Sequence, residues 1–310
     1  MSHQIPMAFV SKYRADVQLL LQQKQSKFEP YVRVESQSAQ YDFYEQIGPV
    51  SAQPWGPRHG DTPLMETPHL RRRVGMSPWI WADLIDKPDR LRMLIVPDGP
   101  YTTNAVQAFN RRKDDIIIAS AFAPAYTGHE GETAVAFPES QWFRNADINA
   151  NTGSEKITIA LLTEIKEKFW NNDVDEEEQL VMAVAPNSIS TLLLDEKVTS
   201  ADYNTVKALV QGDIDTYMGF KFLRTTRLPV RLKVAGDPTK GYLRSNLVWV
   251  KSGLLMAKGQ DTSVDVDKRP DKKNATQIMV TMDVGGTRLE EKKVVAFETL
   301  ETTAPVKPAP

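Results

Sequence analysis

The chain has 310 residues, of which 41% are hydrophobic and 25% are charged, and its formal net charge is −2. This is an ordinary globular composition, with enough chain for one large domain or two average ones. The near-neutral charge gives no global attraction to nucleic acid or to an anionic membrane. The absence of cysteine excludes disulfides, thiolate zinc sites, iron–sulfur clusters and a cysteine nucleophile.

The sequence shows neither a secretory signal nor a membrane span. The first residues, MSHQIPMAFVSKYRADVQ, lack a basic stretch followed by a long apolar run. No stretch approaches the roughly 18 apolar residues of a spanning helix. We therefore expect a soluble protein that folds in a reducing compartment.

The first 30 residues are expected to form an N-terminal arm with one amphipathic helix. Val10, Tyr13, Val17 and Leu20 recur at helical spacing, with charged residues between them. Little neighbouring sequence is available to this apolar stripe. We expect it to pack on distant parts of the fold or on another subunit.

An extended loop is predicted next. Hydrophobic residues alternate in YVRVESQSAQYDFYEQIG, from Tyr31, and a second strand pattern follows in RRRVGMSPWIWADLI, from Arg71. Between them, residues 48–70 contain three glycines and five prolines, too many for regular structure. The pattern predicts a strand, an irregular tip and a returning strand. A loop of this length is uncommon within a compact domain and is usually functional.

The stretch DGPYTTNAVQAFNRRKDDIIIASAF, which starts at Asp98, predicts a long helix over about 100–123. Asp98 can cap its first amides, and a similar start at Asp86 predicts a shorter helix before it. At about 23 residues the long helix would span roughly 35 Å. Its two ends are apolar, but its centre, NRRKDD, is charged on all sides. We expect this centre to be exposed or to face a neighbouring subunit.

The rest of the chain mixes helical and strand patterns. Ile157, Leu161, Ile165 and Phe169 recur at helical spacing in SEKITIALLTEIKEKFW, and the buried strand LVMAVA follows. Helices are expected over NSISTLLLDE and SADYNTVKALVQ, and a strand over GFKFLRTTRLP. The last part is rich in strands, with the alternating segment ATQIMVTMDV, and it ends in a tail that we expect to be disordered.

The stretch HGDTPLMETPHLRRRVG, from His59 to Gly75, resembles a functional site. A metal site is disfavoured, because His59 and His69 are ten positions apart across a proline-rich tip. In a strand, Arg71 and Arg73 point to one side and Arg72 to the other, so the three cannot form one anion clamp. Two interpretations stay open, a solvated strand and a set of salt bridges to another subunit.

The segment MDVGGTRLEEKK resembles the phosphate loop of sugar kinases and actin-like ATPases. In that family the loop lies near the start of the chain and a nucleotide-binding fold follows it. Here Asp283 is too close to the end of the sequence for such a fold. We expect a glycine turn between two strands, and no catalytic or cofactor-binding constellation supports an enzyme.

The order of these elements resembles the major capsid protein of tailed bacteriophages. Specific stretches of the chain look like one phage capsid family. They are VRVESQSAQYDFYEQIG, RHGDTPLMETPHLRRRV, WADLIDKPDRLRMLI, VTSADYNTVKALVQGDIDTYMGFKF, VDKRPDKKNATQIMV and GGTRLEEKKVV. They extend from near residue 5 to near residue 297 in the order of the family.

The resemblance implies an α+β protein with the Hong Kong 97-like capsid fold. Its parts would be an N-terminal arm (1–30), an extended β-hairpin loop (31–80), a peripheral domain with a long spine helix (81–123 and 246–298), an α/β axial domain (124–245) and a flexible tail (299–310). The extended loop would lie over an adjacent subunit. The expected inter-subunit contacts are Trp55, Arg71, Arg72, Arg73, Trp79 and Trp81, with the arginines meeting acidic groups such as Glu176–Glu178, Asp114 or Asp115.

By the same resemblance, the chain would self-assemble as hexamers and pentamers into an icosahedral shell around phage double-stranded DNA. It would be a structural virion protein without a metal or cofactor, assembled in the host cytoplasm, with separate scaffolding and portal proteins and a possible decoration protein. Arg72→Glu or Trp81→Ala is expected to impair assembly and leave the subunit folded. The alternatives are a nanocompartment (encapsulin-type) shell and an ATP-dependent phosphotransfer enzyme.

Overall fold

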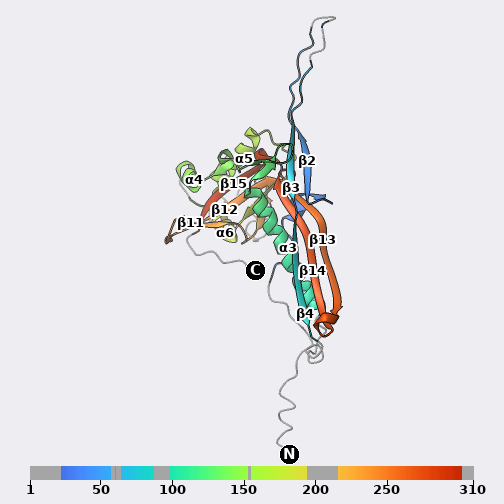
Figure 1. Cartoon of the computed structure of the whole chain (residues 1–310). Coiled ribbons are helices and arrows are strands. Elements are labelled where there is room, and N and C mark those ends of the chain that lie inside the picture. Colours follow the sequence, from blue (N-terminus) through green and yellow to red (C-terminus); the bar gives the residue numbers. More distant parts are fainter. Residues whose placement is uncertain are drawn as a thin grey trace, which may run out of the picture.

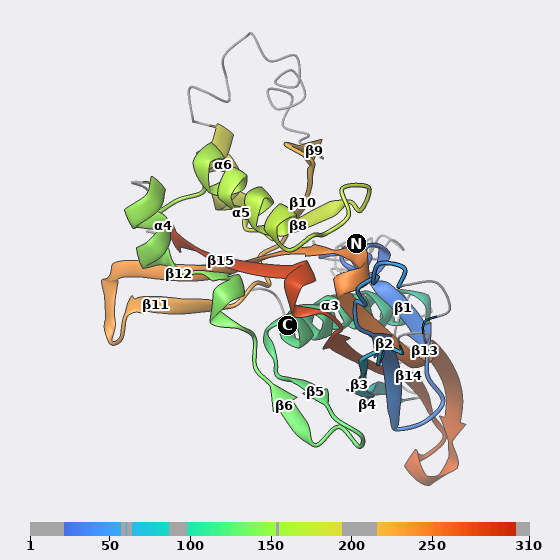
Figure 2. The same cartoon turned by 90° about the horizontal axis from the view of Figure 1, so that it is seen from above.

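The computed structural model describes residues 22–56, 60, 64–86, 98–152, 155–193 and 216–301. The helices expected in the N-terminal arm, after Asp86 and over SADYNTVKALVQ lie outside these ranges. The fold is elongated, with a β-hairpin extending from one end and the turn of a second hairpin at the other (Figure 1). A larger sheet with its helices lies to one side (Figure 2).

A four-stranded sheet and one long helix form the elongated part of the molecule. The strands, in spatial order, are β1 (Arg33–Ser36), β13 (Leu254–Arg269), β14 (Ala275–Arg288) and β4 (Ser77–Ile85). Helix α3 (Asp98–Phe122) lies across one face of this sheet. The residues of β14 that face α3 are buried, as the alternation of ATQIMVTMDV predicted: Ile278, Val280, Met282 and Val284.

A seven-stranded mixed sheet forms the second layer. Its order is β7 (Trp142–Phe143), β15 (Val294–Glu301), β12 (Asp237–Val250), β8 (Leu180–Val184), β10 (Phe220–Arg224) and β9 (Thr216–Tyr217), and β11 (Val230–Val234) also pairs with β12. Residues of β12 alternate between two cores. Leu247 and Trp249 pack in the core shared with α3, and Val248 packs in the core on the other face.

Three helices cover that other face. They are α4 (Asn145–Thr152), α5 (Ile159–Asn171) and α6 (Pro186–Leu193). The expected apolar stripe of α5 is confirmed, because Leu161, Ile165 and Phe169 are buried. The helix begins later than its pattern suggested, since the hydroxyl of Thr158 accepts a hydrogen bond from the backbone N–H of Leu161 at 3.3 Å and caps it.

The extended hairpin belongs to a third sheet. Its strands are ordered β2 (Tyr41–Ile47), β3 (His69–Gly75), β5 (Ala125–Thr127) and β6 (Thr133–Val135). Short 3-10 turns join several elements: η1 (Glu29–Tyr31), η2 (Glu139–Gln141), η3 (Lys251–Gly253), η4 (Pro270–Lys272) and η5 (Glu291–Lys293).

The sheets divide the chain differently from the expected ranges. Strands β1 and β4, at the two ends of the range 31–80, pair with β13 and β14 and not with the hairpin. Strands β12 and β15 pair along eight positions, from Tyr242 opposite Glu301 to Trp249 opposite Val294. The two ends of the range 246–298 therefore lie in the larger sheet, whereas β13 and β14 between them lie in the four-stranded sheet. The expected tail begins too early, because residues 299–301 are part of β15, and Thr299 and Glu301 are buried.

The expected glycine turn in MDVGGTR is wrong. Strand β14 continues through Gly285 and Gly286 to Arg288. A Cβ atom on Gly285 would lie 2.0 Å from the carbonyl oxygen of Gly75, and one on Gly286 would lie 2.9 Å from the hydroxyl of Ser120. The two glycines therefore allow the backbone between β3 and β4, and helix α3, to approach the strand closely. A phosphate loop is excluded at this position, since the motif lies inside a continuous strand.

Candidate subunit interface

The three arginines of β3 have different environments. Arg72 is buried: its Nη2 donates to both carboxylate oxygens of Glu291, at 2.6 and 2.7 Å, and its Nε donates to the carbonyl of Leu289 at 3.1 Å. Arg71 makes an exposed 2.9 Å ion pair with Glu45, directly opposite on β2. The partner of Arg72 within the chain is therefore not one of the acidic residues that the sequence suggested.

Arg73 lies between two tyrosine rings. Its guanidinium carbon is 5.1 Å from the ring centroid of Tyr41 and 4.8 Å from that of Tyr126. Tyr41 belongs to β2 and Tyr126 to β5, so this contact joins the extended hairpin to the short hairpin β5–β6. Cation–π contacts of this kind contribute about 0.5–1 kcal/mol at exposed sites.

A second arginine lies beside Glu291. The Arg288 side chain is fully buried and donates to the carbonyls of Ala121 and Ala123 at the end of α3, at 2.8 and 3.1 Å. Its Nε is 3.7 Å from the Glu291 carboxylate. Burial lowers the pKa of Arg288, and the Glu291 charge opposes this shift. Glu291 thus joins the base of the extended hairpin to the end of the long helix.

The expected tryptophan contacts divide into two groups. Trp55, in the tip of the extended loop, is 97% exposed. Trp79 and Trp81 are half-buried against the core beneath α3, and the Arg112 guanidinium lies 3.7 Å from the centroid of the Trp79 ring. Within this chain, both tryptophans of β4 serve intramolecular packing.

Alternate residues of β4 point away from the helix. Ile80 is 68% exposed and Leu84 is 47% exposed. The sequence analysis did not select these two residues, because it chose candidate contacts by their large aromatic side chains. The alternation of Trp79, Ile80 and Trp81 contained the necessary information, since neighbouring residues of a strand face opposite sides.

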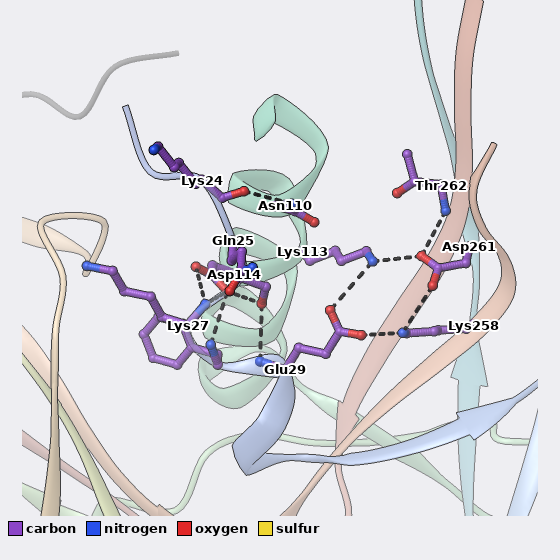
Figure 3. A network of polar contacts seen from close by, with 12 residues as sticks. Lys24, Gln25, Lys27, Glu29, Asn110, Lys113, Asp114, Lys258, Asp261 and Thr262 are labelled. Atoms are coloured by element: carbon purple, nitrogen blue, oxygen red, sulfur yellow. Dashed lines mark hydrogen bonds and ion pairs between the residues drawn. The ribbon is translucent and has the colours of Figure 1, made fainter. Parts of the chain in front are cut away.

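Much of the charged centre of α3 is bonded within the chain, and Arg111, Lys113 and Asp114 are buried, contrary to the expectation that this centre is exposed or faces a neighbour. The Asp114 carboxylate accepts hydrogen bonds from the Ser26 hydroxyl at 2.6 Å and from the backbone N–H groups of Lys27 and Phe28 at 3.1 and 3.2 Å (Figure 3). It also accepts one from the side-chain amide of Gln23. Burial raises the pKa of Asp114, and these hydrogen bonds oppose the rise. The segment before β1 is therefore attached to the middle of the helix.

The neighbouring charges also have partners in the chain. The Lys113 amine is 2.7 Å from a carboxylate oxygen of Asp261 and 3.5 Å from one of Glu29, which in turn bonds Lys258 (Figure 3). The hydrogen bond from Lys113 lowers the pKa of Asp261 to about 2. On another side of the helix, Asp115 binds Arg227 with an Nε–Oδ1 distance of 2.5 Å.

The described ranges offer neither a metal site nor a membrane-spanning helix. There, histidine, aspartate and glutamate nowhere gather in a group of three or more that could hold a metal ion. The helices of these ranges include none that is long and apolar enough to cross a membrane. His69 begins β3 and is exposed, and His59 lies outside the described residues.

The fold is that of phage capsid shells. The structure is similar to the capsid protein of the Ralstonia phage GP4 (TM-score 0.73, 9% identity, 97% of this chain and 96% of that one). It is also similar to that of the cyanophage P-SCSP1u (TM-score 0.71, 15% identity, 94% and 93%). A third similar structure comes from the Helicobacter pylori bacteriophage KHP30 (TM-score 0.69, 8% identity, 95% and 96%). No curated protein matches the chain.

The family is shown by the sequence itself. The model of the phage capsid protein family matches residues 5–301, nearly the whole chain. These matches support a major capsid protein with a structural role and do not favour the nanocompartment alternative. The chain therefore belongs to the phage capsid protein family and is a component of the virion shell.

Proposed function

We propose that this chain is the repeating subunit of an icosahedral phage head, assembled in the host cytoplasm as hexamers and pentamers and enclosing double-stranded DNA. The observation that carries the proposal is the extended hairpin with an exposed apolar end. Four large apolar side chains of this end are exposed: Val50 (61%), Trp55 (97%), Leu64 (95%) and Met65 (43%). Exposed apolar groups gathered in one segment are typical of interaction sites.

The partner of the hairpin is a neighbouring copy of the same chain. The hairpin projects beyond the sheets that form the core, so its end has little of its own subunit to pack on (Figure 1). In a closed shell every copy both provides a hairpin and receives one. Burial of one large apolar side chain contributes about 1.5–3 kcal/mol. Repeated contacts of this size can hold a shell together without covalent links.

The proposed contact residues are Trp55, Arg71 and Arg73, which are reachable from outside the subunit. Arg72, Trp79 and Trp81 are proposed to act indirectly. Arg72 fixes the base of the hairpin through Glu291, and the two tryptophans support strand β4 from the helix side. Exposed ion pairs contribute only about 0–1 kcal/mol each. The apolar end is therefore the stronger anchor.

The three sheets correspond to the three parts of the expected capsid subunit. We assign the four-stranded sheet with α3 to the peripheral domain, the seven-stranded sheet with α4, α5 and α6 to the axial domain, and the β2–β3 hairpin to the extended loop. We further propose a non-catalytic role without metal or cofactor, with separate scaffolding and portal proteins and an optional decoration protein.

Electron microscopy of three purified proteins tests the proposal. The wild-type protein is expected to form closed shells or hexameric and pentameric rings as its concentration rises. Trp55→Ala should raise the concentration needed for assembly by at least roughly tenfold, since a lost anchor of about 1.5–3 kcal/mol exceeds the 1.4 kcal/mol that corresponds to that factor. Trp55→Phe, which keeps an aromatic ring, should largely restore assembly. Assembly of Trp55→Ala at the wild-type concentration would refute the role of the hairpin end.

A further inference from the structure

A groove lies beside the segment before β1, which Asp114 binds to helix α3. Its volume is about 670 Å³, and one wall is formed by residues 23–27. The other wall is formed by Pro186 and by Arg224, Thr225 and Thr226 at the end of β10. The charged side chains that line it are Lys24, Lys27 and Arg224, and no carboxylate is among its described lining residues.

A second groove lies along the same segment and shares Gln25 and Ser26 with the first. Its volume is about 700 Å³. Its lining adds three cations, Arg33, Lys251 and Lys258. Lys258 is bonded to the one carboxylate of the lining, Glu29, and Arg33 is paired with Glu35 outside the groove. The two grooves thus form a basic surface on a chain whose formal net charge is −2.

One cation of this surface, Lys27, is held in place. Lys27 donates its Nζ to the carbonyl of Arg224 at 2.7 Å, which joins the two walls of the first groove. The backbone N–H of Lys27 is fixed by the Asp114 carboxylate. Figure 3 shows the side chains of Lys24 and Lys27 extending from the segment on the side away from β13. Groups fixed before binding lose less conformational freedom when a ligand arrives.

We propose that these two grooves bind the sugar–phosphate backbone of nucleic acid, and that this face of the subunit meets the packaged DNA. The inference rests on the proposed function and extends it to named residues. Lysine and arginine neutralise phosphates and release counterions, and hydroxyl and amide groups such as those of Thr226 and Gln25 add hydrogen bonds to phosphate oxygens. Contacts of this kind carry no sequence preference, as packaging of a whole genome requires.

An acidic peptide is a poorer occupant. Stable peptide docking uses apolar pockets for anchoring side chains. The first groove is lined by charged, hydroxyl and amide side chains, and Pro186 is its only apolar lining residue among the described ones. A polyanion with regularly spaced charges fits this lining better than a peptide with apolar anchors.

Fluorescence anisotropy with a labelled DNA duplex of mixed sequence tests the proposal on unassembled full-length protein. The dissociation constant is measured over a salt series for wild type, for Lys24→Ala/Lys27→Ala and for a control, Lys272→Ala/Lys273→Ala. The control removes the same charge from the exposed β13–β14 turn. The groove variant should make the slope of log K against log salt shallower by about 0.9 per lysine, and the control should leave it unchanged.

Equal slopes for the groove variant and wild type would overturn the proposal, as would equal effects of the groove variant and the control. A poly-glutamate peptide that binds as tightly as the duplex would also overturn it, in favour of an acidic protein partner. Electron microscopy of the groove variant separates this inference from the proposed function. Normal shells of the groove variant with unaltered DNA binding would refute only the grooves. Wild-type protein that binds DNA through the groove lysines but forms no shells would refute only the assembly role.

Discussion

Nη2 of Arg72 donates to both carboxylate oxygens of Glu291, although the two residues are 219 positions apart in the chain. The side chain of Arg72 is 8% exposed and that of Glu291 is 23% exposed, so solvent screens this pair only weakly. The pair joins the extended hairpin to η5. It fixes the strand from which the hairpin projects, and it explains why the middle arginine of the triplet differs from its neighbours.

Loss of Arg72 is therefore expected to destabilise the subunit itself. In Arg72→Ala, the Glu291 carboxylate loses both short hydrogen bonds in a largely buried position and keeps the 3.7 Å contact with Arg288. The Leu289 carbonyl loses one donor and keeps the amide of Gln46. Removal of one partner from a buried ion pair costs about 3–5 kcal/mol. Arg72→Glu would place two carboxylates together and should destabilise the fold further. The sequence suggested that Arg72→Glu would leave the subunit folded, whereas the buried pair with Glu291 predicts a destabilised subunit. Urea unfolding of the unassembled protein measures the change.

Arg71→Ala is the matched control for this prediction. Arg71 lies one position away on the same strand, and its ion pair with Glu45 is exposed on both sides. Its removal should change the free energy of unfolding by less than about 1 kcal/mol. Equal losses for the two variants would contradict a structural role that is specific to Arg72.

A side chain at Gly285 should disrupt the junction between the hairpin and the sheet. In Gly285→Ala the new Cβ would meet the backbone carbonyl of Gly75 at 2.0 Å, and backbone cannot rotate away as a side chain can. Overpacking of this kind costs about 1–3 kcal/mol or more. Gly56→Ala is the control, because a Cβ there meets nothing within 4 Å. Thermal unfolding should show a lower Tm for the first variant only, and an unchanged Tm for Gly285→Ala would contradict the close approach.

Asp114 should control the attachment of the segment before β1. In Asp114→Ala, the N–H groups of Lys27 and Phe28 lose their acceptor, at a cost of about 1–3 kcal/mol for each buried donor. Phe28, which stacks on Trp249 with ring centroids 5.6 Å apart, would be less firmly held. Hydrogen exchange of these two amides should accelerate at least tenfold, since about 1.4 kcal/mol corresponds to that factor.

Asp115→Ala provides the contrast. Asp115 is the next residue of the helix, but it binds Arg227 and not the N-terminal segment. Its loss should accelerate exchange around Arg227 and leave the amides of Lys27 and Phe28 protected. The same exchange pattern in both variants would show that general helix destabilisation, and not the Asp114 contacts, holds the segment.

The sequence predicted the elements that have a local pattern and missed the contacts that do not. Helix α5 and strand β14 follow from hydrophobic periodicity, which each segment carries by itself. The charged centre of α3 suggested exposure because charges are rarely buried without partners. The partners of Asp114 lie 86 to 91 positions earlier, where no periodicity marks them.

Two further misses have the same cause. Gly-Gly pairs usually mark turns, but Gly285 and Gly286 serve close packing against elements from elsewhere in the chain. Of the expected contact residues, Trp55 is fully accessible to a partner, because the proline-rich tip of the hairpin does not bury it. The environments of Arg72 and Trp79 depend on η5 and α3, so only the assembled fold could reveal them.

The ion pair between Lys113 and Asp261 should make the free energy of unfolding depend on pH in the acid range. The pKa of Asp261 falls from 3.8 in the unfolded chain to about 2 in the fold. A carboxyl group with a depressed pKa stabilises the fold above its unfolded pKa, and this contribution is lost as the pH falls through the folded value. The Asp261 side chain is 62% exposed, so the contribution should stay below about 1 kcal/mol.

A comparison of Asp261→Asn with wild type isolates this contribution from all other acids. The difference in free energy of unfolding should be constant above about pH 5 and should vanish as the pH approaches about 2. In a Lys113→Met background, where the amine that depresses the pKa is gone, most of this pH dependence should disappear. The difference in free energy of unfolding would contradict this account if it persisted at acid pH, or if its pH dependence were unchanged in the Lys113→Met background. The link between β13 and the middle of α3 would then not be electrostatic.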